Sequence, residues 1–213
     1  MEARRLRFAG VETGTRMSVV RLANGGLFVH SPVSLDAATR EAVDALGPVK
    51  AGVAPSRFHP LYACEWSRAY PDAVLCACPG LERKRPDLSW HRVLGDEPEA
   101  EWRSEIDQVF FGARSLENEI VFFHRSSRTL ICADLIFNLA NHPSLLTRIV
   151  ARLIGSRKPG ATLLERVLIR KRAAAREQVD RMLAWDFDRI VLAHGAIIEA
   201  GGHQVLRRAY AWL

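Results

Sequence analysis

Two stretches of the chain show the pattern of a β-hairpin, in which a short polar segment separates two apolar or β-branched runs. The four apolar runs are residues 17–22, 27–30, 120–123 and 130–132. Asn24-Gly25 supplies the positive φ of a tight turn in the first stretch, and the polar segment 125–128 has the length of a hairpin turn in the second. We therefore predict one β-hairpin near the start of the chain and another in its middle.

Helical and strand patterns alternate along the rest of the chain. Residues 35–46 place apolar side chains at helical spacing, follow Ser34 as a candidate N-cap and stop before a Gly-Pro pair, so we expect an amphipathic helix. The further helices expected are 61–70, 162–185 and 204–213. The further strands expected are 49–54, 73–77, 106–111 and 189–193. Residues 145–154 form another element, and 87–105 are assigned only as connecting structure.

The two halves of the chain share one order of elements, in which antiparallel strands come first and helix and strand follow. Two mixed sheets of this kind bury their apolar faces by packing against each other, with the helices outside. We therefore predict an α/β (α+β) fold, a four-layer αββα sandwich, with a site at one open edge. We expect a single domain over 1–213, in which about 1–16 form a charged N-terminal arm.

Composition is consistent with one core and adds a charge pattern. With 213 residues and 48% hydrophobic content, the chain can bury one substantial core. The formal net charge of +6 is unevenly spread, because residues 148–176 carry nine Lys or Arg and a single acid, Glu165. Such a surface attracts phosphates, nucleic acid or anionic lipid, although in most proteins it is a solvated face. No motif that reads RNA or DNA accompanies it, so binding of nucleic acid by this basic surface is kept only as a lower-ranked alternative.

The sequence lacks the patterns of a membrane span and of an export signal. Its apolar runs fall short of the roughly 18–20 residues of a span, and no apolar core follows the charged N-terminal residues. The four cysteines lack CxxC spacing and lie in or beside apolar segments, so we expect reduced thiols in the core. We therefore predict a cytoplasmic protein without a membrane partner.

One acid, Asp134, is surrounded in the sequence by residues that favour burial. It follows the strand predicted at 130–132, and the residues after it are again apolar. A buried carboxylate costs several kcal/mol unless something pairs with it. Backbone N–H groups at a strand end would satisfy Asp134, and so would a cation or a metal. The residues themselves leave both interpretations open.

Three polar residues, His59, Asp134 and His194, follow predicted buried strands. Side chains at the strand ends of packed sheets converge on a shared rim, where sites in layered folds usually lie. Two imidazoles and a carboxylate can bind Zn²⁺ or Fe²⁺ and leave coordination positions open for water or substrate. Each histidine also has a structural interpretation. We name these three residues as candidate metal ligands, with one Zn or Fe ion, or none, as cofactor.

Three segments carry a resemblance to a known family: a hairpin ending I-C-A-D-L-I-F, a late strand ending V-L-A-H-G, and a loop after a V-x-A strand. They resemble the metallo-β-lactamase superfamily. Over residues 19–213 the chain is similar to an uncharacterised branch of it, a domain of unknown function, through phrases such as F-F-H-R-S-S-R-T-L and L-A-W-D-F-D-R-I-V-L-A-H-G. The resemblance implies the αββα sandwich and metal-ligand roles for Asp134 and His194.

The chain departs from the superfamily pattern where most metal ligands should stand. The H-x-H-x-D-H motif falls in a loop that reads P-S-R-F-H-P, and His59 is the one histidine left there. The histidine that usually precedes the central hairpin falls near 115–118, where Glu117 is a candidate replacement. A two-metal site needs about five or six protein ligands. This chain offers at most three or four.

Two further histidines lie near these segments. His142 follows Asn138 and Asn141 in a polar loop after Asp134, and it is a candidate fourth ligand. His124 precedes the hairpin turn, at the far end of the hairpin from Asp134, and we interpret it as structural.

Three functions fit these observations. Our leading prediction is a non-classical member of the fold that lacks most metal ligands and binds a small ligand or partner at the cleft. The first alternative is a mononuclear metal-dependent hydrolase of an ester, lactone, thioester or phosphoester. The second is a metal-free enzyme in which His59 or His194 is a general base oriented by Asp134. Binding of nucleic acid by the basic surface ranks below them.

Overall fold

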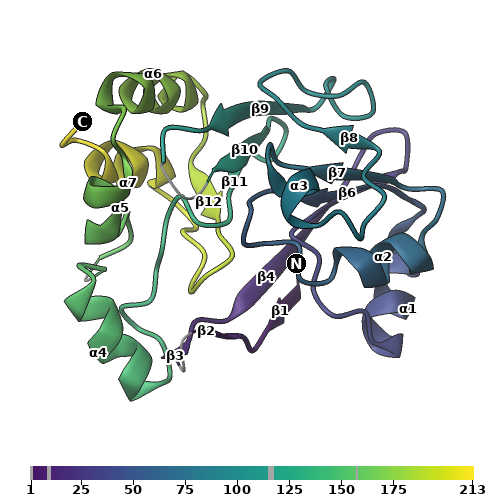
Figure 1. The fold of residues 1–213 in the computed structure, drawn as a ribbon, viewed down its shortest axis with the longest axis horizontal. Helices are drawn as coiled ribbons and strands as arrows, with labels where there is room; N and C mark the ends of the chain where they lie inside the picture. Colours follow the sequence, from purple (N-terminus) through teal and green to yellow (C-terminus); the bar gives the residue numbers. More distant parts are fainter. Residues whose placement is uncertain (1, 9–10, 115–117, 157) are drawn as a thin grey trace.

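The computed structural model describes residues 2–8, 11–114, 118–156 and 158–213, and it contains two mixed β-sheets packed face to face (Figure 1). The first sheet, in spatial order, consists of β1 (Glu2–Arg4), β4 (Thr15–Arg21), β5 (Leu27–His30), β6 (Val49–Ala54), β7 (Val74–Ala77) and β8 (Arg92–Val93). The second consists of β12 (Arg189–Val191), β11 (Thr129–Ile131), β10 (Glu119–His124) and β9 (Ile106–Phe111). A separate short hairpin pairs β2 (Arg7–Phe8) with β3 (Val11–Glu12).

Both sheets combine parallel and antiparallel pairs. In the first sheet β5, β6, β7 and β8 run parallel, and β4 pairs antiparallel with β5. In the second sheet β12 runs parallel to β11, whereas β9, β10 and β11 form an antiparallel meander. Both predicted β-hairpins are therefore present, as β4–β5 and as β10–β11.

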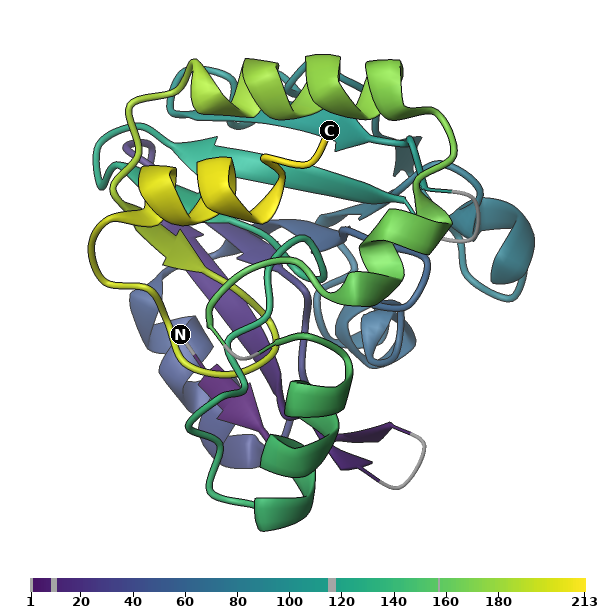
Figure 2. The same ribbon diagram turned by 90° about the vertical axis from the view of Figure 1, so that its left-hand side faces the viewer.

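Helices cover the outer faces of the two sheets. Helices α1 (Ala37–Leu46) and α2 (Ala63–Ala69) flank the first sheet, and α6 (Arg172–Leu183) and α7 (Gly202–Ala209) cover the second, as Figures 1 and 2 show. The remaining helices are α3 (Leu81–Lys84), α4 (Leu145–Leu153) and α5 (Leu163–Leu168). The layer order is αββα, so the predicted sandwich is confirmed.

Alternate side chains of β10 fill two different cores, because successive residues of a strand point to opposite faces of the sheet. Ile120 and Phe122 point between the sheets, where the rings of Phe122 and Phe28 lie 5.1 Å apart. Val121 and Phe123 point to the other face, into the apolar cluster beneath α6 and α7. Buried on both faces, β10 thus joins the inter-sheet core to the outer core.

The first helix begins later than predicted. Its N-cap is Asp36, whose carboxylate accepts a hydrogen bond of 2.8 Å from the Thr39 backbone N–H. The prediction of Ser34 as the cap is therefore wrong. Both residues have the short polar side chain that a cap needs, so residue type alone did not separate them.

The single long helix predicted over 162–185 is also wrong, because the chain forms α5 and α6 with a break between them. Ile169, at the end of α5, has an extended backbone and forms an isolated β-bridge with Arg114. Its side chain is 2% exposed and belongs to the outer core. Burying Ile169 against the end of β9 requires the backbone to leave the helical path.

The N-terminal residues, which the sequence suggested only as an arm, add structure to the first sheet. Strand β1 pairs antiparallel with β4 and extends the sheet at that edge. This position brings residues 14–16 beside the segment that follows β12.

In the part of the chain that the structure describes, no helix combines the length and the apolar character needed to cross a membrane. Cys64, Cys76, Cys78 and Cys132 are free thiols, as predicted, and all but Cys64 are buried.

Truncation of Phe122 tests the role of the inter-sheet core. We expect Phe122→Ala to lower the free energy of unfolding by about 3–5 kcal/mol, because it removes a fully buried ring and leaves a cavity. Phe58→Ala is the matched control, since Phe58 is 47% exposed, and it should change the free energy by about 0.5 kcal/mol or less. Denaturant titration of both variants measures the difference, and equal losses would contradict this assignment of the core.

Candidate metal centre

The three residues predicted as metal ligands lie together at one rim of the two sheets. His59 belongs to the loop after β6, Asp134 to the segment after β11, and His194 to the segment after β12. One donor atom from each lies within 4.8 Å of the others, and each residue is 7% exposed. Strand ends of both sheets therefore assemble one cluster, as the sequence predicted.

The His59 ring is held from outside the cluster by a residue of the first sheet. Its Nδ1 lies 2.7 Å from the hydroxyl of Ser31, the residue after β5. The backbone N–H of His59 donates to the Ser56 carbonyl at 3.2 Å and closes a turn. These contacts direct Nε2 inward, where it lies 3.3 Å from His194 Nε2 and 3.3 Å from Asp134 Oδ2.

Side chains surround the carboxylate of Asp134. The Ser56 hydroxyl donates to Oδ2 at 3.2 Å, and His194 Nε2 lies 3.1 Å from Oδ1. The backbone N–H of Asp134 instead donates to Glu119 at 3.0 Å. The sequence left open whether backbone N–H groups or a cation satisfy this buried acid. The described contacts of its carboxylate are with side chains, the Ser56 hydroxyl and the two imidazoles.

The tautomer of neutral His194 follows from its outer contact. His194 Nδ1 lies 2.7 Å from the Gly14 carbonyl oxygen, which only accepts hydrogen bonds, so Nδ1 carries a proton. The ring stacks on Phe137 with centroids 5.5 Å apart and an interplanar angle of 7°. Nε2 is consequently the atom that His194 presents to Asp134 and His59.

A glycine must follow His194 because another backbone passes directly over it. Gly195 has a φ of +102°, and a Cβ there would lie 2.0 Å from the Asn138 carbonyl oxygen. The Asn138 N–H donates to the His194 carbonyl at 3.2 Å. Arg16 donates to the carbonyls of Leu192 and Gly195 at 2.5 and 2.8 Å. The His-Gly pair is thus fixed between β4 and the segment after Asp134.

A buried ion cluster fixes the backbone that carries Asp134. Glu119, the first residue of β10, accepts the N–H groups of Ala133 and Asp134. Arg114 donates to the Asp134 carbonyl at 3.1 Å and to Glu165 at 2.8 Å, and it lies 3.7 Å from Glu119 Oε2. The side chains of Arg114 and Glu119 are fully buried, so this cluster is bonded without competition from bulk water.

Burial and charge shift the pKa values of the cluster in different directions. Burial, with the nearby Asp134 charge, raises the pKa of Glu119 to about 7 despite the opposing effect of Arg114. Burial alone would raise the pKa of Asp134, but His59 and His194 hold it well below its usual value. Burial opposes the charged form of His194, yet Asp134 and the Gly14 carbonyl raise its pKa overall. Without a metal, Asp134 and His194 therefore favour the ion-paired state.

A family model described as a domain of unknown function, DUF4336, matches residues 5–165, more than half of the chain. The chain belongs to the DUF4336 family. No curated protein matches it. The sequence-based prediction of a domain of unknown function is therefore confirmed.

Solved structures similar to this DUF4336 chain include several metallo-β-lactamases. DIM-1, exposed to ceftazidime, aligns with a TM-score of 0.65 and 14% identity over 99% of this chain and 90% of that one. The enzyme from Pontibacter korlensis aligns with a TM-score of 0.65 and 10% identity over 98% and 91%. FIM-1 from Pseudomonas aeruginosa, in its mono-zinc form, aligns with a TM-score of 0.64 and 12% identity over 99% and 89%. At these identities the similarity establishes a metallo-β-lactamase-like fold and nothing about activity.

Of the other candidate ligands of the DUF4336 chain, His142 is described by the structure and does not join the three-residue cluster. His142 Nδ1 accepts the backbone N–H of Ser144 at 3.1 Å, at the start of α4. His124 ends β10, and its Nδ1 lies 2.7 Å from the Ser127 hydroxyl, consistent with the structural role we predicted. Glu117 lies outside the described residues.

Sequence reasoning missed the residues that position the three ligands. Glu119 had a usable signal, because an acid that opens the apolar strand E-I-V-F-F is as unusual as Asp134 itself. Arg114, the partner of Glu119, comes shortly after the strand predicted at 106–111. Gly14 contacts His194 only through its backbone carbonyl oxygen, and a backbone contact of this kind cannot be predicted from a pattern of side chains.

Substitution of Glu119 tests the buried ion cluster. In Glu119→Gln the amide keeps one acceptor oxygen, so one of the two backbone N–H groups loses its partner. We expect a loss of about 1–3 kcal/mol in the free energy of unfolding, measured by denaturant titration above pH 7, where Glu119 is ionised. The control is Glu199→Gln, because the Glu199 side chain is 69% exposed in a surface pair with Arg189. Equal losses in the free energy of unfolding for the two substitutions would contradict the role of Glu119 in fixing the backbone of residues 133 and 134.

The stability of the metal-free protein should depend on pH through Asp134 and His194. The raised pKa of His194 stabilises the fold fully below pH 6.5, and this contribution is lost as pH rises through the folded-state pKa. The depressed pKa of Asp134 stabilises the fold above pH 3.8, and this contribution is lost as pH falls through the folded-state pKa. Asp134→Asn should therefore destabilise the chelator-treated protein most between these two values. Denaturant titrations across that range measure it, and a pH-independent difference would contradict the ion pair.

Proposed function

We propose that this protein is a mononuclear metal-dependent hydrolase in which His59, Asp134 and His194 hold one Zn²⁺ or Fe²⁺. The observation that carries the proposal is the inward direction of both imidazole Nε2 atoms toward one carboxylate. This proposal gives the metal-bound alternative more weight than the sequence alone did.

The electrostatics of His194 support a cation in the cluster. With a proton on Nδ1, neutral His194 turns the lone pair of Nε2 toward Asp134 Oδ1 at 3.1 Å and toward His59 Nε2 at 3.3 Å. Lone pairs facing a carboxylate at these distances repel one another. Either a proton on Nε2 or a cation among the three donors removes the repulsion.

The donor spacing fits the smaller transition metals. Zinc bonds of about 2.0–2.1 Å to nitrogen or oxygen in a tetrahedron place neighbouring ligand atoms about 3.3 Å apart. The three separations in the cluster are 3.1, 3.3 and 3.3 Å. Two histidines and one carboxylate are also a donor set that zinc and ferrous iron share. Ser31 and the Gly14 carbonyl occupy the outer nitrogens, as neighbours of metal-binding histidines commonly do.

The chemistry that follows is hydrolysis of an ester, lactone, thioester or phosphoester. A divalent cation supplies Lewis acidity toward a carbonyl or phosphoryl oxygen and lowers the pKa of a bound water. Three protein ligands leave positions open for water and substrate. The Ser56 hydroxyl, which donates to Asp134 Oδ2 at 3.2 Å, would help to orient Asp134 as a ligand. FIM-1, a metallo-β-lactamase of the same fold, was solved with a single zinc, so the fold accommodates such a centre.

The second candidate is the metal-free protein that binds a small ligand or partner at the same rim. The raised pKa of His194 favours it, because a proton on Nε2 satisfies Asp134 without a metal. The absence of the H-x-H-x-D-H motif from the sequence favours it as well.

Metal content separates the two candidates. Protein purified without chelator, and the same protein dialysed against Zn²⁺ or Fe²⁺, should carry about one metal per chain by elemental analysis. Asp134→Asn and His194→Gln should each lower the content to about one tenth or less, since each removes one of only three ligands. A metal-dependent esterase, lactonase, thioesterase or phosphoesterase activity should disappear with chelator and return when metal is restored.

His124→Gln serves as the matched control, because His124 lies at the far end of β10 and should leave the metal content unchanged. Absence of metal from the wild type under both conditions would refute the hydrolase and leave the ligand-binding candidate.

A further inference from the structure

Helix α4 turns its apolar stripe toward solvent. Four large apolar side chains of this helix are between 46% and 75% exposed: Leu145, Leu146, Ile149 and Leu153. At 3.6 residues per turn they occupy an arc of about 100°, and the buried Thr147 and Ala151 lie on the opposite side. The Thr147 hydroxyl donates to the Glu12 carbonyl at 2.7 Å. The side of α4 with the small residues Thr147 and Ala151 therefore packs against the protein, and the side with the large apolar residues stays outside.

Helix α5 repeats this arrangement. Its large apolar side chains are between 52% and 72% exposed: Leu163, Leu164 and Val167. Glu165, on the opposite side of the helix, is buried and paired with Arg114. The Leu163 N–H donates to the Ile154 carbonyl at 2.8 Å, so α5 begins where α4 ends. Both helices lie along the left edge in Figure 1 and on the near side in Figure 2.

These two helices concentrate the exposed apolar surface of the protein. Among the described residues, eleven large apolar side chains are exposed, and seven of them belong to residues 145–167. Single exposed apolar residues need no explanation, but a contiguous group usually marks an interaction surface. We call these seven side chains the α4–α5 apolar face.

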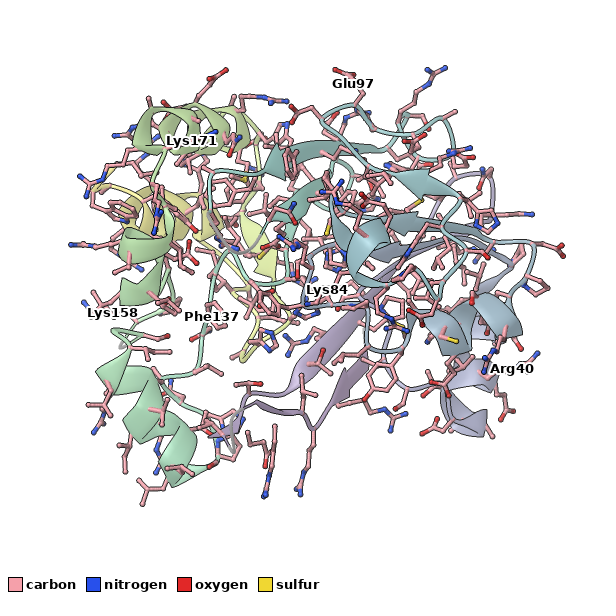
Figure 3. All side chains as sticks on the ribbon, in the orientation of Figure 1. Arg40, Lys84, Glu97, Phe137, Lys158 and Lys171 are labelled. Carbon is pink, nitrogen blue, oxygen red and sulfur yellow. The ribbon has the colours of Figure 1, made fainter. Side chains whose placement is uncertain are left out.

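Exposed basic side chains lie on α4 and α5, on the chain between them and on the chain that follows α5. The exposed Lys and Arg between 148 and 176 are Arg152, Lys158, Arg166, Arg170, Lys171, Arg172 and Arg176. Lys158 and Lys171 lie along the same edge of the molecule as α5 in Figure 3. The single acid of this stretch, Glu165, is neutralised inside the protein by Arg114. The nearby Glu12 side chain lies 3.9 Å from Arg5.

We propose that the α4–α5 apolar face docks on an anionic lipid bilayer, lying at the interface without crossing it. An apolar helix face bordered by Lys and Arg matches the chemistry of that surface, since the apolar side chains enter the acyl region and the cations meet lipid phosphates. Long basic side chains at the border of the face also reach the headgroups easily. This inference does not depend on the metal centre, and it replaces the expectation of no membrane partner.

Charge complementarity favours the bilayer over the other occupants. A second copy of the chain, docked symmetrically, would bring its own Arg152, Lys158 and Arg166 close to those of the first copy. Nucleic acid would satisfy the cations but offers no hydrocarbon layer for seven apolar side chains.

Cosedimentation of the full chain with vesicles tests the proposal. The protein should sediment with vesicles of equal parts phosphatidylcholine and phosphatidylglycerol at low salt, and much less with phosphatidylcholine alone or at high salt. The triple substitution Ile149→Ser, Leu153→Ser and Val167→Ser should lower partitioning by about ten-fold or more. Its control is Leu46→Ser with Val93→Ser, which alters exposed apolar residues elsewhere and should have no effect.

A second pair of variants tests the charges. Arg152→Gln with Arg166→Gln should weaken partitioning by about twenty-five-fold, at about five-fold for each cation. Arg21→Gln with Lys50→Gln, both exposed, is the matched control. All these side chains are exposed, so the fold should survive, which a thermal melt checks.

Three results would overturn the inference. One is equal sedimentation with neutral and anionic vesicles. Another is a dimer in sedimentation velocity that the triple serine variant converts to monomer, because a second copy would then cover the face. The third is binding to duplex DNA that exceeds binding to anionic vesicles and survives the serine substitutions.

Discussion

The hydrogen bonds of one buried carboxylate determine where the candidate metal centre forms. Glu119 accepts hydrogen bonds from the backbone N–H groups of residues 133 and 134. These two bonds fix the direction of the backbone after β11. Arg114 compensates the negative charge and holds the next carbonyl, which offsets the cost of removing these ions from water. These bonds fix the backbone of Asp134 independently of its side-chain contacts. The two imidazoles therefore face a carboxylate whose position is already determined.

The histidines are positioned by neighbours outside the cluster. The Ser31 hydroxyl, after β5, and the Gly14 carbonyl, before β4, contact the two Nδ1 atoms and leave both Nε2 atoms facing Asp134. A two-metal centre is held together partly by its many ligands. This rim offers three candidate donors, so the hydrogen bonds around them contribute more to holding the donors in place. In this DUF4336 chain, substitutions of the residues that position the donors should therefore affect the centre as substitutions of the donors do.

The sequence predicted those features that local pattern determines. Strands β6 and β9 coincide with the predicted 49–54 and 106–111, and the three candidate ligands follow predicted strands, because alternation and strand length are local properties. The break before α6 escaped prediction, since the bridge of Ile169 to Arg114 depends on a contact across 55 residues. The α4–α5 apolar face escaped it for another reason. Periodicity shows that a helix has an apolar side, but it does not show whether that side meets the core or the solvent.

The contact between His194 and Gly14 also has a consequence for biosynthesis. It joins residues 180 positions apart, and Arg16 joins Leu192 across 176. Domains are synthesised from the N-terminus, so both sheets except β12 can pair before His194 leaves the ribosome. Two of the three donors then exist without the third, and the ring that completes the set follows the strand β12. A nascent chain is thus kept from assembling the site until nearly all of its fold is in place.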